Sequence, residues 1–390
     1  MTRSHPIDLL RGFIIILMII DHAMVYCLSY SVSDPMTIDN TTPLVFFTRF
    51  SSHFCAPLFI FLAGLSASIT ENRYGSPHLF AKDLIVRGIV LIVLEFTLIS
   101  WSWSFNPLFP MLYAQIIWAI GWGFIGLGLL RLAGVRAIFG VGIVLVFAHN
   151  LLDGLTFADN TAWHYLWSVL HQKNVLALPF DVKVRTTYPI LPIVGLLCLG
   201  YLFGRHTANG TNQSLPKLTT ALLWYGFICI AGYSLLRGFN VYGDPGLFTV
   251  YDSSLLTLMS FLNPTKYPLS LQFMLLTVGV GLVLLFFFSK LPSTFSLCFL
   301  QILGRASMFS YIVHLYLLHA MSWLLIPVMG YNYSDMTYNS TLIGLPEGYG
   351  FSYLETLLLV AVVVSVTTFL AKRYLHWKKA NHKNLIARYI

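Results

Sequence analysis

The sequence has 390 residues, of which 57% are hydrophobic and only 10% are charged, and its formal net charge is +8. Soluble domains carry about 25% charged residues, so this composition excludes a water-soluble fold and favours an integral membrane protein. The basic residues are spread over alternating loops, which argues against nucleic-acid binding. The five cysteines form no CxxC pair, and their odd number argues against a disulfide framework.

Apolar segments recur along the whole chain, and a helix needs about 20 apolar residues to cross a bilayer. The fifth segment is short enough to be half-inserted, and the ninth belongs to a longer apolar stretch with room for a re-entrant piece. We predict an all-α polytopic membrane protein of about ten, or eleven, transmembrane helices. We expect one domain over 1–371 and a basic cytoplasmic tail over 372–390. The predicted spans are 9–28, 54–70, 84–102, 111–130, 135–149, 188–204, 218–236, 270–289, 304–326 and 352–371.

The distribution of Lys and Arg predicts the orientation, because cytoplasmic loops carry an excess of both. A cytoplasmic N-terminus puts most of the 23 Lys and Arg residues inside, including those of the tail, and an even number of spans puts the C-terminus there too. In the outer loop 150–187, segment 161–178 has an apolar face and predicts a helix lying in the membrane interface as a structural cover. The basic residues left outside are Arg49, Lys173, Lys183, Arg185, Arg237 and Lys266.

The first span carries ionisable residues on one helical face. Asp8, Arg11 and His22 share this face through spacings of three and four. Eleven residues of helix separate Arg11 from His22 by about 16 Å. A charge at the centre of a membrane helix costs about 2.5–3.5 kcal/mol, so we expect this helix to face a protein interior or an aqueous cavity. The alternative is an Asp8–Arg11 ion pair at the inner interface, with His22 as an ordinary interhelical donor.

Histidines also occur in the outer half of other predicted spans. His53 opens the second span, His149 ends the fifth, and the ninth contains His314 and His319. A single membrane histidine is usually a packing residue, but histidines from four spans favour a shared polar site. Gly121, Gly123 and Gly126 match GxGxxG inside an apolar run, where close helix packing explains them better than a dinucleotide. We predict no metal site.

Several stretches resemble known membrane acyltransferases. LLRGFIIILMIIDH resembles the first-helix signature of transmembrane acyltransferases, in which ten residues stand between an arginine and a histidine, here Arg11 and His22. The stretches 34–64, 187–204 and 303–319 are similar to bacterial members of the heparan-alpha-glucosaminide N-acetyltransferase catalytic-domain family. This resemblance implies ten or eleven helices around a pore-like active site, with acetyl-CoA entering from the cytoplasm. Lysosomal members carry an active-site histidine in the first luminal loop, a position that His53 does not match cleanly.

The residues and the resemblance together predict an acetyl-CoA-dependent membrane acyltransferase. It would move an acetyl group to an amino sugar or glycan hydroxyl or amine on the periplasmic side of the bacterial inner membrane. Acyl transfer needs a base for the attacking group, and histidine titrates near neutrality. The expected catalytic residues are His22, as base or transient acyl carrier, Asp21 and His53. Arg11 and Arg305 would bind the donor, and the expected acceptor-binding residues are Arg49, Tyr311, His314 and His319.

The expected partners are the lipid bilayer, acyl-CoA and a glycan acceptor, without nucleic acid, and a homodimer is left open. A proton-coupled transporter or flippase of an envelope precursor is the alternative function, because intramembrane Asp and His suit a proton relay equally well. Inverted repeats with broken helices would favour a transporter, and the sequence shows no such symmetry.

Overall fold

The computed structural model describes residues 5–29, 35–105, 111–208, 218–292, 297–335, 348–381, 384 and 387. In these residues, nine helical stretches are long and apolar enough to cross a membrane. The predicted all-α, polytopic membrane fold is thereby confirmed. The chain forms two compact units. The first unit comprises Met1–Cys55, Leu98–Leu108 and Leu291–Ile390, and the second comprises Ala56–Thr97 and Phe109–Lys290.

The first unit is built from helices whose starts are marked by capping residues. Thr42 caps one helix by accepting the Val45 N–H, and Ser352 and Glu355 form a capping box at another. The longer apolar stretch around the ninth predicted span contains two helices, a short one and a long one. The elements are α1 (His5–Cys27), η1 (Ile38–Asn40), α2 (Pro43–Ser51), η2 (Ser52–Phe54), α5 (Ser100–Ser104), α13 (Cys298–Arg305), α14 (Ser307–Val328), η6 (Tyr333–Asp335) and α15 (Tyr353–Ala380).

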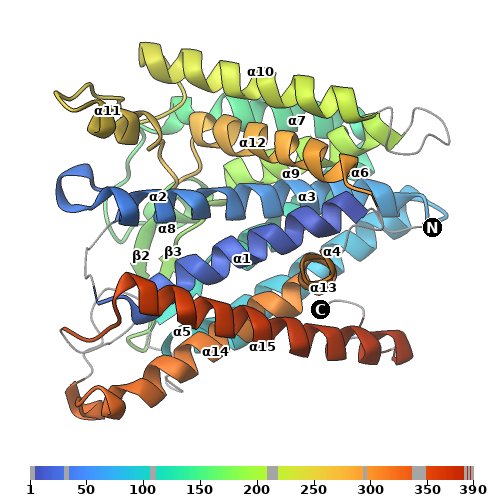
Figure 1. Cartoon of the computed structure of the whole chain (residues 1–390). Helices are drawn as coiled ribbons and strands as arrows, with labels where there is room; N and C mark the ends of the chain where they lie inside the picture. The colour runs from blue at the N-terminus through green and yellow to red at the C-terminus, as the bar shows by residue number, and fades with distance from the viewer. Residues whose placement is uncertain are drawn as a thin grey trace. The chain divides into compact units, whose positions relative to one another are not determined.

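Helices α1 and α15 run in opposite directions within the first unit (Figure 1). The end of α1 meets the start of α15, because the Phe351 N–H donates to the Cys27 carbonyl and the Ser29 N–H donates to the Phe351 carbonyl. The start of α1 and the end of α15 therefore lie at the same end of this unit, as two termini on one side of the membrane require. That this side is the cytoplasm stays a prediction. Helix α15 extends nine residues beyond 371, and most of the tail beyond it lies outside the described residues.

Two glycines let α1 and α13 approach each other closely. A Cβ atom built on Gly12 would lie 2.0 Å from the Leu300 carbonyl oxygen, and one on Gly304 would lie 1.8 Å from the Asp8 carbonyl oxygen. Both distances are impossible for a real side chain, so the two backbones touch only because these residues lack one. The close approach of α1 and α13 also places Arg305, which follows Gly304, beside the start of α1.

We expect Gly304→Ala to lower the free energy of unfolding by about 1–3 kcal/mol, because the added methyl group must push α13 away from α1. Gly140→Ala is the matched control, because nothing lies within 4 Å of a Cβ atom at that helical glycine. Thermal unfolding of the two purified variants in the same detergent checks the prediction. Equal unfolding temperatures for both variants would contradict it.

The second unit contains the remaining helices and a small sheet. Its elements are α3 (Cys55–Glu71), α4 (Pro77–Leu94), a π-helical turn η3 (Glu95–Ile99), β1 (Met111–Ala114), α6 (Ile116–Ala133), α7 (Val135–Phe147), η4 (His149–Leu152), α8 (Ala162–Leu170), β2 (Asn174–Ala177), β3 (Lys183–Thr186), α9 (Ile190–Ala208), α10 (Leu218–Phe239), α11 (Ser254–Phe261) and α12 (Leu271–Lys290).

The sheet corrects two boundaries expected from the sequence. Its strand order is β1-β3-β2, with β1 parallel and β2 antiparallel to β3. The span predicted from 111 begins with strand β1 instead of a helix, because Met111 pairs with Lys183. The interfacial helix predicted over 161–178 stops at Leu170, because Asn174–Ala177 pairs with β3. Strands β1 and β3 lead directly into α6 and α9, so these two helices start at the same end of the unit.

A buried ion network joins the other ends of α3, α6 and α9. The Glu71 carboxylate accepts from Arg131 Nε at 2.6 Å, from Arg205 Nη1 at 3.3 Å and from the Tyr201 hydroxyl. At the opposite end, His149 donates toward the Leu269 carbonyl beside the start of α12. Helix α7, which connects these two ends, therefore crosses the unit. Its 13 residues and η4 span about 28 Å together, which is close to the thickness of the hydrocarbon core of a bilayer.

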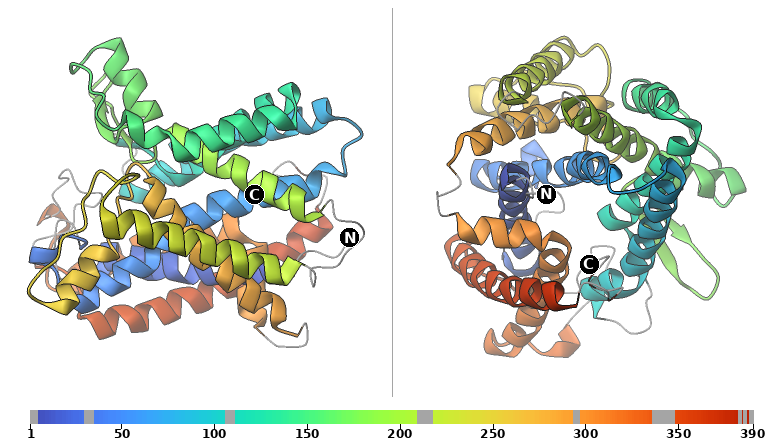
Figure 2. Two further views of the ribbon diagram at one scale, coloured as in Figure 1. Left: turned by 90° about the horizontal axis from the view of Figure 1, so that it is seen from above. Right: turned by 90° about the vertical axis from the view of Figure 1, so that its right-hand side faces the viewer.

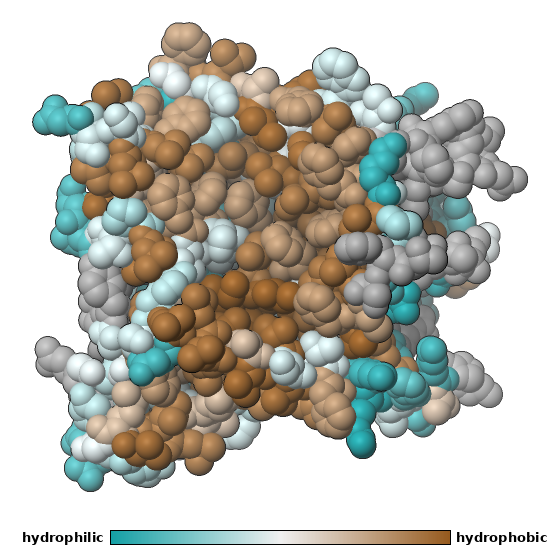
Figure 3. All heavy atoms as spheres, in the orientation of Figure 1, coloured by the Kyte–Doolittle hydropathy of each residue, from teal (hydrophilic) through white to brown (hydrophobic). Residues whose placement is uncertain are grey.

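Exposed apolar side chains mark the surfaces that face lipid. Helix α10 packs along α12 in both views of Figure 2 and exposes Trp224, Phe227, Ile228, Leu235 and Phe239 on its other side. In the space-filling view, hydrophobic side chains cover the outer surfaces of α10 and α15 (Figure 3). A soluble protein rarely exposes such surfaces, and a membrane covers them at no cost.

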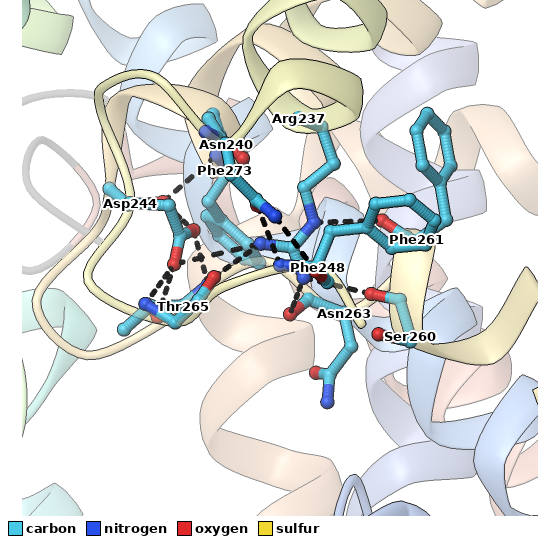
Figure 4. Close-up of polar contacts among 12 residues, drawn as sticks. Arg237, Asn240, Asp244, Phe248, Ser260, Phe261, Asn263, Thr265 and Phe273 are labelled. Carbon is cyan, nitrogen blue, oxygen red and sulfur yellow. Dashed lines mark hydrogen bonds and ion pairs between the residues drawn. The ribbon is translucent and has the colours of Figure 1, made fainter. Parts of the chain in front are cut away.

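A buried guanidinium holds the loop between α10 and α12. Arg237 is 2% exposed, and it donates to the carbonyl oxygens of Gly246, Ser260, Phe261 and Asn263 (Figure 4). Asp244 lies 3.9 Å from the same guanidinium. Its carboxylate accepts the backbone and hydroxyl protons of Thr265 and the hydroxyl proton of Ser270. We call this arrangement the Arg237–Asp244 clasp.

Candidate active site

Helices α1 and α14 of the first unit bring two histidines into direct contact. Nδ1 of His22 lies 2.8 Å from Nε2 of His314, and the two ring planes differ by only 9°. Nδ1 of His314 lies 2.8 Å from the Ser310 carbonyl oxygen, one turn earlier on α14. His314 is completely buried, whereas His22 is partly exposed. The result is a chain of hydrogen bonds that ends on the more accessible ring.

This chain assigns the tautomers of both rings. The Ser310 carbonyl can only accept, so His314 donates through Nδ1 and, as a neutral ring, has a lone pair at Nε2. His22 must therefore donate to that lone pair through Nδ1. In the neutral form of His22 the remaining lone pair is at Nε2, which is the ring atom able to take up a proton. His314 thus orients the His22 ring, and a catalytic base needs an orienting partner of this kind.

Aromatic rings surround the His22–His314 pair. The Trp103 ring lies edge-on to His22 with 5.2 Å between centroids, and Tyr311 lies 6.5 Å from the same ring. Tyr26, one turn beyond His22, stacks on Trp103 at 5.7 Å. These contacts fix the His22 ring in one orientation, which a proton-transferring group requires.

Both ring nitrogens of His319 are engaged in hydrogen bonds. Nδ1 donates to the Ser102 carbonyl at 2.7 Å, and Nε2 accepts from the Trp323 indole N–H at 2.7 Å. The Tyr26 hydroxyl donates to the same Ser102 carbonyl at 3.2 Å. His319 and Tyr26 therefore hold the end of α5, and with it Trp103, against α1 and α14. This geometry favours a positioning role for His319 over the acceptor contact expected from the sequence.

Asp21 forms an ion pair with Arg49, which joins α1 to α2 beside His22. The side chains of Asp21 and Arg49 are 10% and 21% exposed, so the pair is largely shielded from water. His53 lies in η2, is 2% exposed, and presents its ring edge-on to Phe50 at 5.8 Å. Asp21 and Arg49 are thus brought together, and their catalytic and acceptor-binding roles stay predictions.

The predicted donor-binding residues lie at the other end of α1. Arg305 Nε lies 3.3 Å from the Asp8 carboxylate, and the Arg305 side chain is 42% exposed. Arg11 follows Asp8 by three residues and is partly exposed. Helix α1 is continuous from Arg11 to His22, so the separation of about 16 Å along its axis holds. Guanidinium groups are well suited to phosphate, so these residues fit the charged end of a coenzyme A donor.

The comparisons with known proteins identify the family. The family model for the catalytic region of heparan-alpha-glucosaminide N-acetyltransferase matches residues 3–240, which is more than half of the chain. The chain belongs to this family. It is therefore a multi-pass membrane acetyltransferase. A search of curated proteins found no match.

The match to the N-acetyltransferase family covers only part of the candidate site. It includes Arg11, Asp21, His22, Arg49 and His53, and it ends before α12. The partner of His22, His314, lies outside the matched region. In this family member the residue that orients the candidate base was therefore found from the structure alone.

The sequence predicted that histidines from four spans share one polar site. Only part of that site is seen in this family member. His22 and His314 touch, whereas His149 belongs to the second unit. There its ring nitrogens face the Leu269 and Val146 carbonyl oxygens, as expected for a structural histidine. Among the described residues, no group of three or more His, Cys, Asp or Glu could hold a metal ion.

Trp103 and the Ser102 carbonyl were not anticipated from the sequence. Both lie at the end of the third predicted span, in the repeat SWSWS of α5. Tryptophan is common at membrane interfaces, so the repeat is explained equally well by an aromatic belt. Only the contacts with His22, Tyr26 and His319 assign it to the candidate site.

Proposed function

We propose that this acetyltransferase moves the acetyl group of cytoplasmic acetyl-CoA to an amine, most simply that of an amino sugar, on the periplasmic side of a bacterial inner membrane. The observation that carries the proposal is the hydrogen-bond chain from Ser310 through His314 to His22. It leaves a basic atom on a partly exposed ring, in a chain whose family transfers acetyl groups. The excess of Lys and Arg on the predicted inner side supports the sidedness.

His22 acts as the general base. Its Nε2 takes the proton of the acceptor amine as the amine nitrogen attacks the thioester carbonyl carbon. A carbon–nitrogen bond forms, the carbon–sulfur bond breaks, and the proton passes from His22 to the departing thiolate. The imidazolium formed in between keeps its Nδ1 donor on His314, which spreads the charge into a ring held by Ser310. General acid–base catalysis of this kind contributes about 10²–10⁴-fold.

Arg11 and Arg305 hold the phosphate groups of the donor at the inner end of α1. Acetyl-CoA carries its phosphates at one end of a long arm and the reactive thioester at the other. This shape suits the arginines at the inner end of α1 and His22 farther along the same helix. Arg49, paired with Asp21 next to His22, faces the acceptor side and supplies a cation for the developing oxyanion. Tyr311, near His22, contributes to binding of the acceptor.

Coenzyme A should raise the unfolding temperature of the purified protein, because a ligand that binds only the folded state stabilises it by mass action. At 100 times its Kd the stabilisation is about 2.7 kcal/mol. Pantetheine, which lacks the phosphates, should stabilise the protein less. Arg11→Gln and Arg305→Gln should reduce the shift with coenzyme A and leave the effect of pantetheine unchanged. A protein that transports an unrelated solute would show no shift with either compound, and that result would overturn the proposal.

A further inference from the structure

Two lysines of the second unit face the same aromatic ring. The ammonium nitrogen of Lys173 lies 5.0 Å from the centroid of the Tyr267 ring, and that of Lys266 lies 5.3 Å from it. The two positive charges are therefore no more than about 10 Å apart and repel each other. The ring offsets part of this repulsion, because its electron-rich face attracts cations.

The position of Lys266 and Tyr267 is fixed by the fold. Thr265, the preceding residue, donates both its N–H and its hydroxyl proton to Asp244 at 2.7 Å, within the Arg237–Asp244 clasp (Figure 4). Tyr267 packs edge-on against Tyr188 with 5.1 Å between centroids. Lys266 and Tyr267 are consequently presented by a loop that is held on both sides, and Lys173 reaches the same ring from the segment between α8 and β2.

Among the described residues, neither lysine forms an ion pair with a carboxylate. The acids closest in sequence are Asp181 and Asp159 for Lys173 and Asp252 for Lys266, and Asp159 pairs with His164. Two acids farther along the chain also have other partners: Asp244 is bound within the clasp, and Asp153 accepts from His171 and Asn150. Lys173 is exposed and Lys266 is partly exposed, so an anion from outside can reach them. Two fixed cations without a carboxylate partner form an anion-binding site.

The location of the pair indicates which anion this is. Lys266 and Tyr267 come directly before α12, which begins at Leu271, and Tyr188 comes directly before α9, which begins at Ile190. The pair therefore lies at the level where two membrane helices begin, which is the level of the lipid headgroups. Val175, in the strand that follows Lys173, is 49% exposed and offers an apolar surface at the same boundary.

We propose that Lys173, Lys266 and Tyr267 form a binding site for the phosphodiester of an anionic phospholipid headgroup. Ammonium groups bind phosphate as point charges, and each lysine near a membrane surface contributes about a fivefold preference for anionic lipid. All three residues belong to the second unit, and none of them is assigned a role in the acetyl-transfer step proposed above.

Native mass spectrometry of the full chain, with dioleoylphosphatidylglycerol as the probe, tests this site. We expect one tightly bound lipid in the wild type and an apparent Kd raised about tenfold or more in Lys173→Gln/Lys266→Gln. Lys183→Gln is the control for a change of charge outside the site, because it removes one positive charge from an exposed lysine of β3, against two in the double variant, and should change the Kd less than twofold. Lipid-free thermal unfolding verifies that all three proteins are folded.

Three outcomes would overturn the proposal. The double variant would bind the lipid as tightly as the wild type, or Lys183→Gln would weaken binding as much as the double variant. In the third, sn-glycerol 3-phosphate would displace the lipid at equal concentration, which would assign the lysine pair to a soluble phosphate ester.

Discussion

Replacing His22 with alanine is expected to reduce acetyl transfer by about 100-fold or more, with the unfolding temperature close to that of the wild type. The variant loses the only ring atom that the hydrogen-bond chain leaves basic, while the Arg11 and Arg305 end of α1 is unchanged. Binding of coenzyme A, measured by thermal shift, should therefore persist. The measurement is transfer of labelled acetyl groups from acetyl-CoA to glucosamine by purified protein.

Two variants of His314 separate orientation from simple packing. Glutamine at this position can accept from His22 and donate to the Ser310 carbonyl, so His314→Gln should retain much of the activity. His314→Leu keeps the apolar volume but leaves the His22 tautomer undetermined, and its activity should fall further. If both His314 variants were equally active, the orienting role of His314 would be wrong. For the His22→Ala variant of the first prediction, full activity would exclude His22 as the base.

Replacing Arg237 with methionine should destabilise the protein by about 3–5 kcal/mol, because it breaks a buried charge pair. It also removes the donor shared by four carbonyl oxygens of the loop between α10 and α12. Methionine fills a similar volume, so the loss reports the polar contacts and not a cavity. Chemical or thermal unfolding of the purified protein in detergent measures the effect.

Arg136→Met is the matched control for this substitution, because Arg136 is exposed at the start of α7 and should be replaceable with little change in stability. Arg237→Lys should fall between the two, since an ammonium group keeps the charge but cannot reach all four carbonyls at once. An unfolding curve of Arg237→Met that coincides with the Arg136→Met curve would show that the clasp contributes nothing to stability.

The membrane fold could be predicted from the sequence because the bilayer imposes one length and one composition on every crossing. Helix α7 was ambiguous for the same reason, since its 13 residues fall short of that length. The structure adds that α7 runs between the ion network of Glu71 at one end of the second unit and the His149 contact at the other. Neither contact follows from local pattern, because the partners are far apart in the chain.

The candidate site was predictable only one helix at a time. The periodicity of α1 placed Arg11 and His22 on one face, and the ninth predicted span contributed Tyr311, His314 and His319 as candidates. The bond between His22 and His314 joins residues 292 positions apart, which no spacing rule reaches. The different roles of His314 and His319 could not be told apart either, because they depend on which nitrogen meets which carbonyl.

The most direct test of the central claim uses proteoliposomes containing the wild-type protein, with labelled acetyl-CoA on one side and glucosamine on the other. We predict that the label appears in N-acetylglucosamine across the membrane, that transfer needs donor on the side of the Lys- and Arg-rich loops, and that His22→Ala abolishes it. Donor that binds without any label reaching the amine, in protein shown to be folded, would contradict acetyl transfer through His22.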